Sequence, residues 1–352
     1  MDAPRYHSLR VREVIRETAE ACSVWLEPPA GEASRFAYRP GQFLTFRLPV
    51  AGQELQRCYS LSSTPGLDEG LRITVKRVAG GRGSHWICDA LSPGDHLEAL
   101  APGGRFVPAT LEGDFLLFAG GSGITPVLSI LRAVLAEGHG RVRLVFANRD
   151  EASVIFAELL RELQQQYPER LQVIHLLDSL QGPPSRGQLM WLARPWWHAQ
   201  AFICGPGPFM DAVEAALAEL GMPPERIRLE RFAAPARAPS PGVPASAEAA
   251  REAPDAPAPA MAESAVSVAL GGETLSFACR GDETLLEAAA RQGIELPSAC
   301  QAGICASCVC QVVEGEVTLG HNEVLDERDL AQGMTLSCQA QPASERLALK
   351  FL

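Results

Sequence analysis

The chain has 352 residues, of which 47% are hydrophobic and 21% charged, and its formal net charge is −11. This length predicts two or three domains, and the acidic balance argues against nucleic acid or an anionic membrane surface as the main partner. The chain has neither a signal-peptide pattern at its start nor an uninterrupted apolar run of ~18 residues, so we expect a cytoplasmic protein that does not span a membrane. In that compartment disulfides are rare, so clustered cysteines indicate metal binding or redox chemistry.

The first predicted elements, in residues 8–107, are short strands separated by Gly and Pro turns. Apolar and polar residues alternate in the runs "FLTFRLPV" (Phe43–Val50) and "LRITVKRV" (Leu71–Val78). Such alternation is typical of antiparallel strands with one buried face, and it favours a small β-barrel or sandwich. We assign this first domain to residues 1–110.

One strand of this domain carries a candidate anion and ring site in "RCYSLSS", which contains Arg57, Tyr59 and Ser60. The three offer a forked cation, a flat ring and a hydroxyl, which suit phosphate binding, stacking and hydrogen bonding in turn. The glycine-rich "GGRGSHW" (Gly80–Trp86) follows and opens a predicted helix, whose first N–H groups can bind an anion. The nearby Arg72, Lys76 and Arg77 are expected to form a solvated strand face.

These two segments resemble the flavin domain of the ferredoxin–NADP reductase superfamily. The resemblance implies that Arg57, Cys58, Tyr59 and Ser60 hold the flavin, with Ser60 near its reactive nitrogen N5. It places Gly83 and Ser84 at the pyrophosphate. The continuation "SLSSTP" is similar to members that use FAD rather than FMN.

From about residue 112 the pattern changes to continuous apolar strands, each followed by a helix or loop. The strands read "FLLFAG", "VRLVFAN", "LQVIHLL" and "AFICG". Strands buried on both faces and alternating with helices predict a parallel α/β sheet, which we assign to residues 111–232. The glycine turn after the first strand is expected to lead into a helix with Thr125 as N-cap and Pro126 at its first position.

The turn "AGGSGITP" departs from G-x-G-x-x-G, because Pro126 stands in place of the third glycine. Together with "CGPGPFM" (Cys204–Met210) after the last strand, it resembles the pyridine-nucleotide domain of the same superfamily. This implies a pyrophosphate and ribose site at Gly120, Gly121, Gly123 and Thr125, and a nicotinamide site at Cys204, Gly205 and Pro206.

In this resemblance Cys204 helps to shape the geometry of hydride transfer and is not expected to be a covalent nucleophile. The candidate catalytic residues are Ser60 and Cys204. Arg149 is expected at the adenosine half of the nucleotide. The adjacent Asp150 favours NADH, and NADPH stays an alternative.

Residues 233–262 form a predicted linker, since 20 of these 30 residues are Ala or Pro. Such a composition buries too little surface to offset the entropy of ordering. If extended, the segment would reach ~3 Å per residue, or on the order of 90 Å.

The last module, residues 263–352, is expected to begin with a hairpin and a short helix at Thr284–Gln292 that ends at Gly293. Its cysteines follow the spacing Cys300-x4-Cys305-x2-Cys308, with Cys338 further on. Zinc ribbons need two C-x2-C pairs, whereas this spacing is that of plant-type [2Fe–2S] sites.

The segment resembles the plant-type ferredoxin domain, which has an α+β fold of the β-grasp type. The resemblance implies that Cys300, Cys305, Cys308 and Cys338 bind a [2Fe–2S] cluster, and Cys310 falls outside the pattern. The remaining thiols have no partner spacing and are expected to be ordinary small apolar residues: Cys22, Cys58, Cys88 and Cys279.

This domain order resembles a class of bacterial oxygenase reductases, such as the reductase components of 3-ketosteroid 9α-hydroxylase and of phenylacetyl-CoA epoxidase. The resemblance implies electron flow from NADH to FAD, to the [2Fe–2S] cluster and on to a separate oxygenase, with a Rieske-type oxygenase favoured. The alternatives are an NADPH-dependent reductase of a di-iron epoxidase and, from another class, a redox-sensing or scaffolding module without turnover.

The chain carries neither a 2-His-1-carboxylate pattern nor a haem attachment motif, so oxygen activation is expected on another protein. Residues 263–352 hold 13 acidic against 5 basic side chains, a local charge of −8. We therefore expect this module to dock on a basic patch of the oxygenase.

Overall fold

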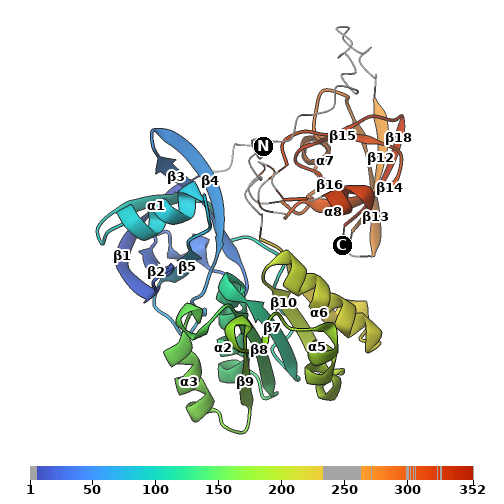
Figure 1. Cartoon of the computed structure of the whole chain (residues 1–352). Helices are drawn as coiled ribbons and strands as arrows, with labels where there is room; N and C mark the ends of the chain where they lie inside the picture. Colours follow the sequence, from blue (N-terminus) through green and yellow to red (C-terminus); the bar gives the residue numbers. More distant parts are fainter. Residues whose placement is uncertain are drawn as a thin grey trace, which may run out of the picture. The chain divides into compact units, whose positions relative to one another are not determined.

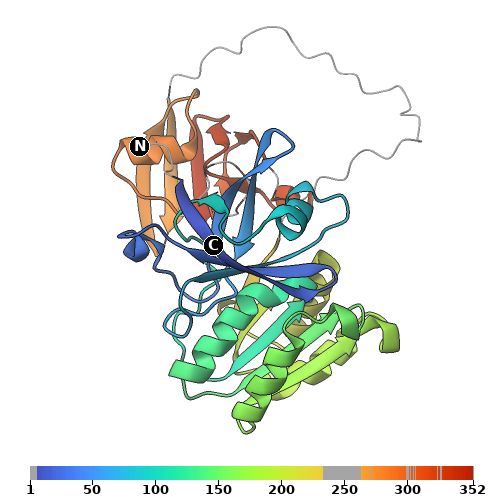
Figure 2. The same ribbon diagram turned by 90° about the vertical axis from the view of Figure 1, so that its left-hand side faces the viewer.

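The computed structural model describes residues 6–232 and 263–351, apart from residues 271, 299, 300, 302, 304, 306, 323 and 326 and the side chains at 327 and 328. The chain divides into two compact units, one within residues 5–232 and the other formed mainly by residues 233–352. Each unit is described by itself, and Figure 1 and Figure 2 show their elements. The predicted linker at residues 233–262 lies outside the described residues.

The first unit begins with a six-stranded antiparallel sheet whose strand order is β4-β3-β6-β1-β2-β5. An isolated bridge between Leu61 and Ile73 joins its two edges, so the sheet curls into a barrel. Apolar side chains from β1, β2, β3, β5 and β6 point inward and are buried, and β4 adds the partly buried Leu55 and Tyr59, which explains the alternating pattern. The predicted antiparallel barrel is confirmed. Its elements are β1 (His7–Thr18), β2 (Ala21–Glu27), η1 (Ala33–Phe36), β3 (Phe43–Val50), β4 (Gln53–Ser60), β5 (Leu71–Lys76), α1 (Arg82–Ala90) and β6 (His96–Ala99).

A five-stranded parallel sheet follows, in the order β11-β10-β7-β8-β9. Helices α2 and α3 pack on one face and α5 and α6 on the other, as Figure 1 and Figure 2 show. Because both faces are covered, the central strands read as continuous apolar runs, and the predicted parallel sheet is confirmed. Its elements are β7 (Phe115–Gly120), η2 (Gly121–Gly123), α2 (Ile124–Glu137), β8 (Val142–Asn148), η3 (Glu151–Ser153), α3 (Ala157–Gln166), β9 (Leu171–Leu177), α4 (Asp178–Gln181), α5 (Arg186–Ala193), η4 (Arg194–Trp196), β10 (Gln200–Cys204), α6 (Gly207–Glu219), η5 (Pro224–Arg226) and β11 (Ile227–Glu230).

Helix α2 begins earlier than predicted. Its N-cap is Gly123, so Thr125 lies inside the first turn and the prediction of Thr125 as N-cap was wrong. The Thr125 hydroxyl instead donates to the Ser122 carbonyl at 3.0 Å, which ties the helix start to the glycine turn. The glycine turn forms the short helix η2, and this continues directly into α2.

Barrel and parallel sheet form one unit because α2 docks on the barrel. The Ser129 hydroxyl donates to the Ser63 carbonyl at 2.6 Å, and Arg132 pairs with Asp68. Arg72 adds to this contact: it is only 8% exposed, and its guanidinium lies over the rings of Trp25 and Phe156. The expectation that Arg72 belongs to a solvated face was therefore wrong, because the neighbouring domain covers it.

The second unit is built on a mixed five-stranded sheet in the order β13-β12-β18-β14-β16, in which β12 and β18 run parallel. Helix α7 packs on this sheet through its buried leucines and alanines, and its N-cap Thr284 forms a capping box with Glu287. The predicted hairpin and helix are present, and α7 runs from Leu285 to Arg291. The other elements are β12 (Ser264–Leu270), β13 (Glu273–Cys279), β14 (Val309–Glu314), β15 (Val317–Leu319), α8 (Glu327–Ala331), β16 (Met334–Leu336), β17 (Ala340–Pro342) and β18 (Arg346–Phe351).

Among the helices of the described part, none is both long and apolar enough to cross a bilayer.

Candidate functional site

The predicted anion and ring site is assembled where α1 meets β4. A Cβ atom added to Gly83 would lie 3.2 Å from Cγ of Arg57 and 3.5 Å from the Tyr59 hydroxyl oxygen, so glycine lets the start of α1 approach both side chains. Burial raises the pKa of Tyr59. Its phenol is therefore a neutral hydrogen-bonding group at neutral pH, beside an arginine and a helix start that suit phosphate.

Ser84 lies in the same turn, but its hydroxyl is engaged locally. It accepts from the Val78 backbone N–H at 3.1 Å and donates to the Gly81 carbonyl at 3.1 Å. The side chain therefore shapes the turn, and what Ser84 can offer an anion is its backbone N–H near the start of α1.

Ser60 ends β4 and lies against the parallel sheet. Its hydroxyl donates to a carboxylate oxygen of Glu230 at 3.2 Å. Glu230 ends β11, where it is the register partner of Cys204 at the end of β10. Glu230, which the sequence analysis missed, thus hydrogen-bonds to Ser60 and lies beside Cys204, the two predicted catalytic residues.

The pKa of this Glu230 carboxyl is raised to about 8, because its burial disfavours the charged form more than the Ser60 hydroxyl stabilises it. Burial also raises the pKa of the Cys204 thiol well above its ordinary value, with the Glu230 charge adding to the effect. A thiol that stays protonated is a poor nucleophile, which agrees with a role for Cys204 in shaping the site.

The two glycine-containing turns of the sheet contact each other directly through their backbones. A Cβ on Gly123 would overlap the Cys204 carbonyl oxygen at 2.1 Å, and one on Gly120 would come within 2.7 Å of Pro206 Cδ. A Cβ added to Gly205 would likewise lie only 2.9 Å from the backbone N atom of Gly120. Only glycine permits this approach, which leaves backbone rather than side chains at the carboxyl edge of β7 and β10.

Two further residues mark this edge at the end of β8. Asn148 is 5% exposed, and its amide nitrogen and oxygen have no hydrogen-bond partner among the described residues. Arg149 lies outside, where its guanidinium pairs with Asp150 at 3.0 Å and with Glu20 at 3.4 Å. A buried amide without partners is costly, and it suits a bound polar ligand that would satisfy it.

The cysteines of the second unit are described in part. The sulfur atoms of Cys308 and Cys338 lie 3.2 Å apart, and both residues are buried. The hydrogen bond between them raises the pKa of Cys308 and lowers that of Cys338, and Cys305 also acts on both electrostatically. Cys300 lies outside the described residues, and within the described part no group of three or more Cys, His, Asp or Glu is placed to hold a metal ion.

Several features of this loop fit a bound cluster. The buried hydroxyls of Ser307 and Ser337, next to Cys308 and Cys338 in sequence, have no partner in the described part of the chain. Gly303 has a φ of +73° and its backbone hydrogen bond lowers the pKa of Cys338. Unpaired donors beside thiols are what the sulfur atoms of an iron–sulfur cluster would use. Cys310 is fully buried in β14, and burial raises its pKa to about 12.

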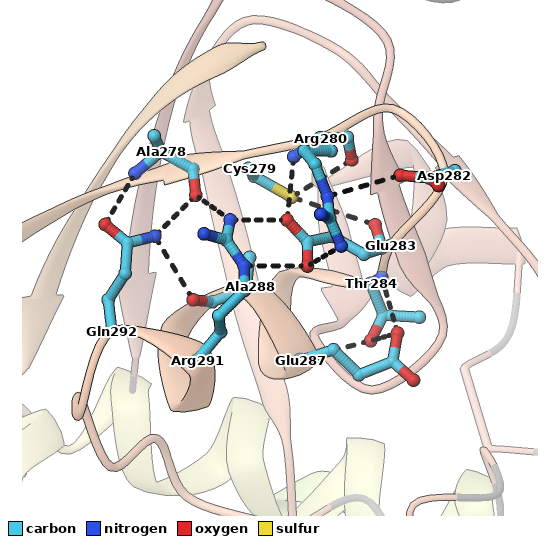
Figure 3. Close-up of polar contacts among 10 residues, drawn as sticks. All are labelled: Ala278, Cys279, Arg280, Asp282, Glu283, Thr284, Glu287, Ala288, Arg291 and Gln292. Carbon is cyan, nitrogen blue, oxygen red and sulfur yellow. Dashed lines mark hydrogen bonds and ion pairs between the residues drawn. The ribbon is translucent and has the colours of Figure 1, made fainter.

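The start of α7 connects this loop to an ionic network around the buried Glu283, drawn in Figure 3. Glu283 is 7% exposed and accepts from Arg291 Nη2 at 2.7 Å and from the Arg280 backbone N–H at 2.9 Å. The Arg291 contact lowers the pKa of Glu283. One turn later the Leu286 N–H donates to the Ser337 carbonyl at 2.9 Å, so the network and the Cys338 segment are held by the same helix end.

Comparison with known proteins gives three family models that match in chain order. They are an oxidoreductase FAD-binding domain at residues 11–107, an oxidoreductase NAD-binding domain at residues 117–215 and a 2Fe-2S iron-sulfur cluster binding domain at residues 268–343. The chain is 45% identical over 344 residues to the ferredoxin reductase component of 3-ketosteroid-9-alpha-monooxygenase from Rhodococcus rhodochrous, covering 97% of this chain and 96% of the relative.

The chain belongs to the three-domain flavin and iron–sulfur oxygenase reductases.

Other relatives agree with this family. A component of 1,2-phenylacetyl-CoA epoxidase from Escherichia coli K12 is 34% identical over 364 residues, which is 98% of both chains. Among solved structures, phthalate dioxygenase reductase matches with a TM-score of 0.57 at 24% identity over 98% of both chains, which supports the fold. The chain is therefore an NAD(P)H oxidoreductase with FAD-binding, NAD-binding and [2Fe–2S] domains, as the sequence analysis predicted.

Glu230 is the main functional candidate that sequence reasoning missed. It lies in "IRLERF", a short strand with alternating charges and no motif. The available signal was its place at the end of the last strand before the linker, since residues at the carboxyl ends of parallel strands gather at the ligand-binding edge.

Proposed function

We propose that this protein is the NADH-dependent reductase component of an oxygenase system, and that it delivers electrons to a separate terminal oxygenase. The observation that carries the proposal is the hydrogen bond between Ser60 and Glu230, which joins the end of β4 to the edge of the parallel sheet beside Cys204. With both groups bound to the protein, FAD and the [2Fe–2S] cluster would convert the two-electron chemistry of a nicotinamide into single-electron transfer.

The residues of this chain would hold and orient those groups. We propose that Arg57, Tyr59 and the start of α1 at Gly83 and Ser84 bind the flavin, and that Cys58 contributes through its place in the same strand. The contact at Gly83 supports this, because its missing Cβ leaves room beside Arg57. At the sheet edge, Gly120, Gly121, Gly123 and Thr125 would line the dinucleotide, with Cys204, Gly205 and Pro206 at the nicotinamide.

In this arrangement the catalytic residues are Ser60 and Cys204. Ser60 would hold the flavin edge through its hydroxyl, whose other partner is Glu230 at 3.2 Å. Cys204 is fully buried and would limit how the nicotinamide lies. We propose cluster ligation by Cys305, Cys308 and Cys338 together with Cys300, and domain limits of 1–110, 111–232, 233–262 and 263–352.

The charges at the adenosine edge support NADH as the reductant. Arg149 is the cation at the end of β8, and both Asp150 and Glu20 pair with it. These two carboxylates neutralise the guanidinium and would repel the 2′-phosphate of NADPH, whereas a free ribose hydroxyl can bind there.

The names of the relatives support an oxygenase as the electron acceptor. Besides the ketosteroid monooxygenase component and the epoxidase component, the reductase subunit of glycine betaine monooxygenase from Pseudomonas aeruginosa is 31% identical over 352 residues. We propose a Rieske-type oxygenase as the acceptor, as the resemblance of the sequence implies, and the relative with the highest identity given above is a ketosteroid monooxygenase component. The alternative is an NADPH-dependent reductase of a di-iron epoxidase, which the 34% identity to the 1,2-phenylacetyl-CoA epoxidase component supports.

An anaerobic titration with NADH and, separately, NADPH tests this function. We expect NADH to bleach the flavin absorbance rapidly and then to produce the EPR signal of a reduced [2Fe–2S] cluster, with NADPH much slower. Faster reduction by NADPH would overturn the nucleotide assignment. If neither nucleotide reduces the flavin, the protein is a sensing or scaffolding module and the proposal fails.

A further inference from the structure

Two cysteines of the barrel, which the sequence gives no reason to pair, lie in direct contact. Cys22 is in β2 and Cys88 is in α1, 66 positions apart, and their sulfur atoms are 3.3 Å from each other. Both are buried, at 2% and 8% exposure. Both are buried as small apolar residues are, and their spacing in the sequence does not indicate this contact.

The surroundings of the pair indicate thiol chemistry rather than metal binding. The Cys88 sulfur also lies 3.5 Å from the carbonyl of Val75, the register partner of Cys22 on the neighbouring strand. Among the described residues no Cys, His, Asp or Glu joins Cys22 and Cys88 to make a metal-binding group of three. Two thiols alone are too few for a zinc or iron–sulfur site.

The contact also distinguishes the two sulfurs. The Cys22 thiol donates a hydrogen bond to the sulfur of Cys88, which lowers the pKa of Cys88 and raises that of Cys22. Cys88 is the more exposed of the two, at 8% against 2%, so it is the sulfur that a peroxide reaches first, and Cys22 is the neighbour that resolves the product.

We propose that Cys22 and Cys88 are a redox modification site, at which a hydroperoxide converts the two thiols to an intramolecular disulfide. The Cys88 thiolate attacks the peroxide oxygen to give a sulfenic acid and releases hydroxide or an alkoxide, which is protonated. The Cys22 sulfur then displaces the hydroxyl group as water. Two S–H bonds break, one S–S bond forms, and the peroxide takes up the two electrons and two protons.

Such a link would join α1 covalently to β2. The same helix starts at the turn where Gly83 packs against Arg57 and Tyr59. A cross-link that closes a long loop disfavours opening of the segment it ties down. We therefore expect the oxidised protein to hold FAD more tightly in kinetic terms than the reduced protein.

Peptide mapping of the full-length holoprotein tests the proposal. After treatment with hydrogen peroxide, alkylation under denaturing conditions and trypsin digestion without reductant, we expect peptides 17–35 and 83–105 to appear linked. Each contains one cysteine, Cys22 or Cys88, so the link is unambiguous. Dithiothreitol should separate them. Recovery of both cysteines alkylated, singly overoxidised or joined to other thiols would overturn the proposal.

Variants and a second readout keep the test independent of folding and turnover. Cys22→Ser and Cys88→Ser should each abolish the link, and wild-type mapping stands even if a variant fails to fold. In wild type, oxidation should slow FAD release, followed by flavin fluorescence on dilution, by about threefold or more. An equal release rate in oxidised and reduced wild type would overturn the stabilising effect. Neither readout uses an electron acceptor, so failure here is distinct from failure of the proposed reductase function.

Discussion

At the scale of single residues, three cysteines of the second unit, Cys308, Cys310 and Cys338, differ in their surroundings. Cys308 and Cys338 have their sulfur atoms in contact at 3.2 Å, whereas Cys310 points into the core from β14 and is fully buried. Burial raises the pKa of Cys310 to about 12, so it stays a thiol. A metal ligand must instead be a thiolate, which a cluster would favour at Cys308 and Cys338.

We therefore predict that Cys310→Ser keeps the [2Fe–2S] cluster and that Cys338→Ser loses it. Iron content, visible absorbance and the EPR signal of the dithionite-reduced protein measure this. Because serine in place of a buried thiol costs some stability, flavin content serves as the control for folding of the rest of the chain. A Cys338→Ser protein with full cluster occupancy would contradict the ligand assignment.

A second residue, Glu230, makes the stability of the first unit depend on pH. Its pKa is raised from the ordinary 4.5 to about 8 by burial. A carboxyl with a raised folded pKa favours the folded state at low pH and loses that contribution as pH rises through the folded pKa. The free energy of unfolding should therefore fall between about pH 4.5 and about pH 8.

Glu230→Gln should remove this dependence. We expect the variant to match wild type near pH 5 and to exceed its free energy of unfolding by up to roughly 5 kcal/mol at about pH 9, since each unit of the pKa difference is worth about 1.4 kcal/mol. Urea denaturation followed by flavin fluorescence measures both. The exposed Glu225 in η5 offers a matched control, since Glu225→Gln changes the same charge without a buried site. Parallel pH profiles for wild type and Glu230→Gln would refute the assignment.

At the scale of elements, the start of α7 depends on Glu283. Its carboxylate receives hydrogen bonds from Arg291 and from the backbone and side chain of Arg280, and Figure 3 shows it between the two arginines. A buried charge with matched partners is costly to disturb, because the arginine contacts lose their anion. At the helix start that Glu283 fixes, the Leu286 backbone N–H also donates a hydrogen bond to the Ser337 carbonyl, which is next to Cys338.

We predict that Glu283→Gln lowers the free energy of unfolding of the second unit by about 2 kcal/mol and shifts the urea midpoint for loss of the cluster absorbance downward. The control is Glu287→Gln in the same helix turn. Glu287 is exposed and caps the helix, so its charge loss should cost less than about 1 kcal/mol. Equal urea midpoints for the two variants would show that the Glu283 network does not stabilise the second unit.

The elements themselves were largely predictable, and the contacts between them were not. β3 runs from Phe43 to Val50, as its alternation predicts, because one face meets the barrel core. The start of α2 was misplaced because Gly123 rather than Thr125 ends the turn. Arg72 was assigned to solvent because a strand pattern cannot show that the neighbouring domain, through Phe156, covers that face.

The same limit applies to the sites. Motifs indicated Arg57, Tyr59 and the glycine turns, since each carries a local chemical pattern. Glu230 and the contact between Cys22 and Cys88 carry none, because they arise only when residues far apart in the chain are brought together by the fold. The spacing of residues in the sequence can indicate ligands that lie on one loop. It cannot indicate a pair of residues that the fold brings together across a barrel.

At the scale of the whole molecule, the charge is concentrated in one module. Residues 263–352 carry 13 acidic and 5 basic side chains, which is −8 of the total −11. Their partner in the proposed function is another protein, so electron transfer out of this module requires an encounter that charge can accelerate.

Exposed charges of this kind are screened by salt, since the Debye length falls from ~14 Å to ~4 Å between about 50 and 500 mM ionic strength. We predict that NADH-driven turnover with the partner oxygenase drops severalfold over this range at subsaturating oxygenase. Reduction of the flavin by NADH alone, measured in stopped flow, is the control and should change much less. Turnover that stays flat while flavin reduction is also unchanged would show that the acidic module does not steer docking.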